Sequence, residues 1–113
     1  MAERRMFSKT IIDSDRFIDM PATARLLYYD LAMRADDDGF VGSPMKIVRM
    51  TDASEDDLDI LEDEGFIIYF ESGVVVITHW RIHNYIRKDT YKPTFYIEEM
   101  SLLSVDDQGV YYL

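Results

Sequence analysis

The chain has 113 residues, of which 22 are acidic and 12 are basic, so its net charge is −10 at neutral pH. This length fits one domain that buries roughly two-thirds of its unfolded surface, and the acidity excludes a protein that coats nucleic acid with its whole surface. The absence of cysteine excludes disulfides and thiolate sites and suits a reducing cytosol.

The amino-terminal segment carries charge but no apolar core, so it does not resemble a secretory signal. Its three basic residues would form a basic arm for nucleic acid, or only aid solubility; they are Arg4, Arg5 and Lys9. The longest apolar runs, 66–70 and 74–77, are far shorter than the ~20 residues of a membrane-spanning helix. We therefore expect a cytoplasmic protein with no membrane partner.

A first long helix is predicted from Pro21 to about Ala35. Proline suits the first turn of a helix, and the apolar residues that follow recur at helical spacing. This apolar face consists of Ala24, Leu27, Tyr28, Leu31, Ala32 and Ala35. A second flank with Leu26, Tyr29 and Met33 widens the apolar arc, which indicates burial on two sides. A partner subunit is one explanation.

A turn and two short helices are predicted next. Residues 36–39, Asp-Asp-Asp-Gly, lack the alternating ligands of a calcium loop, so we interpret them as a helix-ending turn. Ser43 and Pro44 would start a helix that ends near residue 50. Ser54 begins a capping-box pattern, and Gly65 is placed to end the helix that follows it.

Strands follow these helices. The β-branched and aromatic runs 66–70 and 74–80 flank a link that ends in glycine, which predicts a hairpin. A brief strand at Phe40–Val41 would complete the sheet. This order of elements is that of a winged helix-turn-helix, so we predict an α+β, mainly α, fold with its wing hairpin at about 66–80. After Pro93 we expect a carboxy-terminal helix capped by Thr94.

We interpret residues 1–113 as a single winged-helix domain, either complete or the amino-terminal part of a longer protein. The apolar ending, residues 110–113, would dock on this domain or on a neighbour, or mark a fragment.

The predicted second helix of the helix-turn-helix has an unusual charge. Such a helix commonly presents Arg, Lys, Asn or Gln to base edges, but residues 55–64 contain none of these and seven acids. Phosphates would repel these acids, so we expect either a solvated face or a face for docking a protein. The candidate docking face consists of Asp56, Asp59, Glu62 and Asp63. Residues 81–92 of a second subunit would be a suitable basic partner.

Residues 80–93 gather four of the basic residues against one acid. Here cations suit phosphates, an amide suits polar contacts, and aromatic rings suit stacking on sugars or bases. We define the basic strip as Arg81, Asn84, Tyr85, Arg87, Lys88, Tyr91 and Lys92. It would bind nucleic acid or an acidic partner, with modest and salt-sensitive affinity. The alternative is a surface loop whose aromatic residues complete the core.

Other chemistry is not indicated. His79 and His83 have the spacing of two metal ligands on a helix, but a strand end is predicted there and the HExxH pattern is missing. No nucleophile, glycine-rich phosphate loop or metal cluster accompanies the carboxylates. We expect no enzyme, no cofactor, no metal and no small-molecule substrate.

Five segments in one order resemble the amino-terminal domain of phage replisome-organiser proteins related to DnaD. These segments are Met6–Lys9, Asp13–Phe17, Met33–Phe40, Phe70–Ile77 and His83–Asp89. The resemblance covers residues 4 to about 99. It implies a winged-helix fold, a non-catalytic role in DNA replication initiation, self-association as a homo-oligomer, and contact with DNA or other initiation proteins. A winged-helix transcription regulator and a protein-interaction module without DNA contact are the alternatives.

Overall fold

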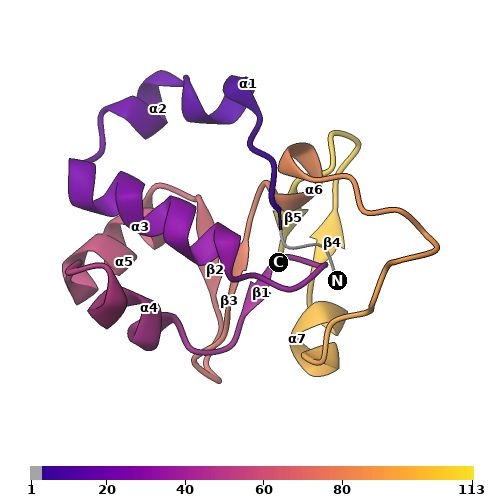
Figure 1. Ribbon diagram of the computed structural model, residues 1–113. Helices are drawn as coiled ribbons and strands as arrows, with labels where there is room; N and C mark the ends of the chain where they lie inside the picture. Colours follow the sequence, from indigo (N-terminus) through magenta and orange to yellow (C-terminus); the bar gives the residue numbers. More distant parts are fainter. Residues whose placement is uncertain (1–3) are drawn as a thin grey trace.

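The computed structural model describes residues 4–113, in which helices α3 to α5 pack on one side of a small antiparallel sheet and the carboxy-terminal elements lie on the other (Figure 1). The fold is α+β and mainly helical. In chain order the elements are α1 (Lys9–Ile12), α2 (Asp15–Ile18), α3 (Ala22–Met33), β1 (Phe40–Val41), α4 (Pro44–Met50), α5 (Glu55–Asp63), β2 (Ile67–Tyr69), β3 (Val75–Ile77), α6 (Trp80–His83), α7 (Ile97–Ser101), β4 (Ser104–Val105) and β5 (Tyr111–Tyr112). No described helix is both long enough and apolar enough to cross a membrane.

Helix α3 is the central core helix, and its predicted apolar face is confirmed. The six residues predicted for this face are fully buried, five of them in α3 and Ala35 just after its end. The second flank is divided, because Leu26 and Met33 are exposed whereas Tyr29 packs edge-on against Phe7 with ring centroids 5.0 Å apart. The chain's own amino-terminal segment therefore covers part of the flank for which a partner subunit was one explanation.

Helix α5 begins with the predicted capping box. The amide of Asp57 donates to the Ser54 hydroxyl at 3.4 Å, and the amide of Ser54 donates to the Asp57 carboxylate at 3.0 Å. The pair satisfies two amides that the first turn leaves without a helical partner. Gly65 follows the helix with φ +82°, a conformation that glycine adopts without a steric penalty.

The three-stranded sheet has the order β1-β3-β2, and both pairs are antiparallel. Val76 of the central strand pairs with Phe40 on one side and with Ile68 on the other. The predicted hairpin is confirmed, but its predicted end is wrong. The strand stops at Ile77, and Trp80 begins α6, because the ring of Trp80 is buried and its indole N–H donates to the backbone of Asp37 at 2.9 Å.

The carboxy-terminal region differs from the prediction in two ways. Thr94 does not cap α7, because its hydroxyl donates to the Asp36 carboxylate and the helix starts later. A hairpin of β4 and β5, which was not predicted, follows α7. Its Tyr111 is 1 % exposed and donates to the carbonyl of Asp38 at 2.8 Å, so this part of the tail docks on its own domain.

Candidate nucleic-acid interface

The turn at residues 36–39, here called the aspartate turn, joins segments that lie far apart in the sequence. Asp36 Oδ1 accepts hydrogen bonds from the amides of Asp38 (2.9 Å) and Phe40 (3.0 Å), as expected of a helix-ending turn. Its other carboxylate oxygen accepts from the Thr94 hydroxyl at 2.5 Å. Among residues 4–113, no group of three or more His, Cys, Asp and Glu side chains is arranged to hold a metal ion.

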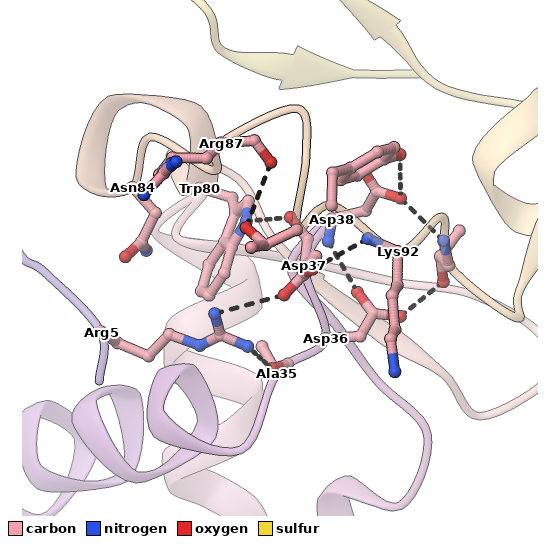
Figure 2. A network of polar contacts seen from close by, with 12 residues as sticks. Arg5, Ala35, Asp36, Asp37, Asp38, Trp80, Asn84, Arg87 and Lys92 are labelled. Atoms are coloured by element: carbon pink, nitrogen blue, oxygen red, sulfur yellow. Dashed lines mark hydrogen bonds and ion pairs between the residues drawn. The ribbon is translucent and has the colours of Figure 1, made fainter. Parts of the chain in front are cut away.

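Asp37 forms a buried ion pair with Arg5. The Arg5 Nη1 and Asp37 Oδ1 atoms are 3.5 Å apart, and each side chain is only 2 % exposed. The Arg5 guanidinium also donates to the carbonyl of Ala35 at 2.7 Å and lies 5.1 Å from the ring centroid of Trp80, as Figure 2 shows. The prediction of a basic arm is therefore wrong for Arg5, because its charge faces inward; Arg4 and Lys9 are exposed.

Asp38 and Asp37 anchor the loop between α6 and α7. The Tyr91 hydroxyl donates to both Asp38 carboxylate oxygens, at 2.9 and 2.8 Å, and the amide of Thr94 donates to one of them at 2.8 Å. The amide of Lys92 donates to the Asp37 carboxylate at 3.0 Å. Burial, with help from Asp38, raises the pKa of Tyr91 to about 12, so its hydroxyl remains a donor at neutral pH. The basic strip, apart from Arg81 in α6, thus lies on a loop that is fixed at one end.

The other end of the loop is fixed by the end of α6. The amide of Ser8 donates to His83 Nδ1 at 2.9 Å, and His83 Nε2 lies 2.6 Å from the Tyr28 hydroxyl. Burial, and to a lesser extent His79, lowers the pKa of His83 to about 4, so the ring is neutral at pH 7 and carries its proton on Nε2. His83 is therefore a structural residue. Asn84, whose Oδ1 accepts from the amide of Met6 at 2.8 Å, likewise holds the amino-terminal segment.

Six of the seven members of the basic strip, including Lys92, are exposed, and only Asn84 is half-buried. Tyr85 is 81 % exposed, and Lys88 forms no ion pair with any described residue. Arg87 pairs with Asp89 at 2.8 Å, but both side chains are mostly exposed, so water and salt weaken the pair. The Arg81 guanidinium lies 5.7 Å from the ring centroid of Tyr111, and the interaction with Tyr111 raises the pKa of Arg81.

A pocket of about 420 Å³ opens beside these side chains. Four aromatic side chains and two cations line it, and of the four rings only those of Tyr85 and Tyr91 are exposed to solvent. The rings belong to Trp80, Tyr85, Tyr91 and Tyr111, and the cations to Arg81 and Lys88. The lining is completed by Asp37, Asp38, Asn84 and Ile86, and the pocket is called the aromatic pocket below. Tyr111 and the aspartate turn are not among the predicted site residues, because nothing local in the sequence places them beside the strip.

The basic strip and the acidic face of α5 lie at opposite ends of the molecule. In Figure 1 the loop between α6 and α7 forms one edge of the view and α5 the other. The predicted docking residues Asp56, Asp59, Glu62 and Asp63 are all exposed. The two surfaces cannot meet within one molecule, so any contact between them would join two copies.

Comparison of the chain with models of known protein families, with curated proteins and with solved structures gave no match. The function of the basic strip is therefore inferred from its residues and their geometry.

Proposed function

We propose that residues 22–77 form a winged helix-turn-helix and that the chain is a non-catalytic, DnaD-like domain of DNA replication initiation. It would self-associate and bind DNA through the basic strip, in the cytoplasm. The order α3-β1-α4-α5-β2-β3, with the strand order β1-β3-β2, supports the fold. The resemblance of residues 4 to about 99 to phage replisome organisers supports the role in replication.

The distribution of charge carries the proposal. In a common winged-helix complex the helix in the position of α5 enters the major groove. Here that helix exposes only acidic groups among its charged residues, whereas exposed cations gather on the loop after α6. Because phosphate contacts dominate the affinity for DNA, the loop is the better contact surface. For the same reason a transcription regulator that inserts α5 into the groove receives less support.

A protein-interaction module without DNA contact is the second candidate. The exposed acidic row on α5 favours it, since such a row would dock a basic protein surface. Binding of DNA to the chain at low salt separates the two candidates.

Self-association is expected to use the apolar surface of the carboxy-terminal region. Here Phe95 is 87 % exposed, Ile97 71 % and Leu102 62 %, and Leu113 is also exposed. Apolar side chains exposed together mark interaction sites more often than single ones do.

Light scattering should therefore give a mass in solution of at least twice the 13.3 kDa of one chain. Ile97→Asp with Leu102→Asp should yield the monomer, because charge on this surface opposes its burial. Met50→Asp on α4, at an equally exposed apolar residue, is the control and should leave the mass unchanged. A strict monomer for the unaltered chain would refute self-association.

DNA binding is expected to depend on the cations of the loop. Arg87→Ala with Lys88→Ala should weaken binding of labelled DNA about tenfold at low salt and reduce the slope of log K against log salt by about 2. The charge-matched control is Lys46→Ala with Arg49→Ala on α4, where both residues are exposed. The fluorescence anisotropy of the labelled DNA measures its binding to the unaltered chain and to both variants.

The control also tests the conventional binding face. If the α4 variant loses DNA and the loop variant keeps it, the DNA lies on the helix-turn-helix and the proposed strip is wrong. If the unaltered chain binds neither single- nor double-stranded DNA, the protein-interaction module is the better account.

A further inference from the structure

The aromatic pocket has features that the binding of phosphates alone does not explain. Phosphate contacts need cations on an open surface, yet here four aromatic side chains line a hollow of about 420 Å³ beside the cations. Such a volume lies in the range of sites for small organic groups. Stacked bases, by contrast, are bound on aromatic side chains next to a cationic groove.

We propose that the aromatic pocket takes one unstacked base of a single-stranded nucleic acid, while Arg81 and Lys88 at its rim hold the adjoining phosphate. The proposal rests on the proposed function, since it names the strand type that the basic strip binds. A strand and a free nucleotide both offer the chemistry that this pocket would recognise, an aromatic base joined to a phosphate.

Three of the four rings are fixed in place by the aspartate turn. The Trp80 indole donates to the carbonyl of Asp37 at 2.9 Å, and the Tyr111 hydroxyl donates to the carbonyl of Asp38 at 2.8 Å. The Tyr91 hydroxyl donates to the Asp38 carboxylate. These walls are therefore set before a ligand arrives, which reduces the entropy lost on binding.

Tyr85 differs from the other three rings. It is 81 % exposed, and its hydroxyl forms no hydrogen bond within the described part of the chain. Of the four rings, that of Tyr85 thus has the largest exposed surface that a stacked base could bury. Because a ring and not a hydroxyl is needed for stacking, phenylalanine should replace it.

The charges of the pocket favour an anionic aromatic ligand over a cationic one. The carboxylates of Asp37 and Asp38 are buried and already accept from Arg5, Lys92, Tyr91 and Thr94. Their hydrogen-bonding capacity is thus used within the fold, whereas Lys88 at the rim has no acidic partner among residues 4–113. A methylated ammonium group in an aromatic cage would lie beside Arg81 and Lys88, which would repel it.

A single strand fits this pocket better than a duplex does. Bases in a duplex are paired and stacked, and reaching a pocket requires one of them to leave the stack. The bases of a single strand are already accessible, so one of them can enter the pocket without the free-energy cost of leaving a duplex.

The test compares Tyr85→Ala and Tyr85→Phe with the unaltered full chain. A short labelled oligothymidylate and a duplex of the same length serve as probes, with anisotropy as the readout. Tyr85→Ala should bind the single strand about tenfold more weakly, with an unchanged salt slope because no phosphate contact is lost. Tyr85→Phe should bind as the unaltered chain does, and the duplex should bind all three proteins equally.

Trp80 provides a second readout, because it is the only tryptophan and lines the pocket. Oligothymidylate should quench its fluorescence, and Tyr85→Ala should reduce this quenching at equal concentration. If the chain binds DNA but Tyr85→Ala changes neither measurement, the base pocket is refuted and the proposed function stands. If the chain binds no DNA, both are refuted.

A competition experiment distinguishes the two sources of the base. Free thymidine monophosphate should displace the oligonucleotide only at far higher concentration, because it lacks the neighbouring phosphates. Displacement at equal concentration would overturn the assignment to a strand and assign the pocket to a free nucleotide.

Discussion

Replacing Gly39 with alanine should destabilise the fold by about 3 kcal/mol, a large fraction of the stability of a small domain. Gly39 has φ +94°, where a side chain is strained, and a Cβ atom would lie 2.6 Å from Trp80 Cγ and 2.8 Å from Trp80 Cβ. The indole cannot retreat freely, because its N–H is bonded to Asp37. Strain accounts for about 1–2 kcal/mol and the overlap for a similar amount. Urea denaturation measures the change in the free energy of unfolding.

The matched control is Gly65→Ala. Gly65 also has a positive φ, +82°, but no atom lies within 4 Å of the position that its Cβ would occupy. Gly65→Ala should thus show the backbone strain alone, about 1–2 kcal/mol. Equal losses at the two positions would show that Trp80 does not pack against the aspartate turn as described, and the walls of the aromatic pocket would then be wrong.

Removing the Asp37 carboxylate should also be severe. Asp37→Ala would leave the Arg5 guanidinium buried without its partner and the amide of Lys92 without an acceptor. Breaking a buried ion pair from one side costs about 3–5 kcal/mol, because the remaining charge stays away from water. The negative charges of the nearby Asp36 and Asp38 reduce the cost of the unpaired Arg5 charge, so we expect the free energy of unfolding to fall by about 3 kcal/mol. Chemical denaturation at neutral pH is the measurement.

A double-mutant cycle isolates the pair. Arg5→Met removes the charge and retains much of the apolar stem, so Arg5→Met with Asp37→Ala should be less destabilising than the sum of the single changes by at least about 1 kcal/mol. The contrasting pair is Arg87 and Asp89, which is shorter at 2.8 Å but 73 % and 63 % exposed. Asp89→Ala should therefore change stability by less than about 0.5 kcal/mol. Additive losses at Arg5 and Asp37 would contradict the buried pair.

The local elements of the fold could be predicted because their determinants lie close together in the sequence. The apolar spacing of α3, the capping box at Ser54 and the hairpin of β2 and β3 each depend on neighbouring residues. The helical start at Trp80 depends instead on a hydrogen bond to Asp37, 43 positions away. The β4–β5 hairpin was missed because its first strand, Ser104–Val105, is exposed and shows no apolar pattern.

The same distinction holds for the site. The outward position of Tyr85, Arg87 and Lys88 follows from their polar or amphipathic side chains in a basic segment, and the prediction placed them together. The burial of Arg5 could not be predicted, because an arginine near a chain end is more often solvated than buried. Its burial requires Asp37 and Trp80 to meet it from two distant segments.

We propose that DNA lies on the loop after α6 and not on α5. The most direct measurement is an NMR titration of the ¹⁵N-labelled full chain with oligothymidylate, which reports the backbone amides that change their surroundings. We expect the amide chemical shifts of residues 81–92 and of Tyr111 to change, and those of residues 55–63 to stay the same. Shifts confined to residues 44–63 would contradict this proposal and place the DNA on the helix-turn-helix.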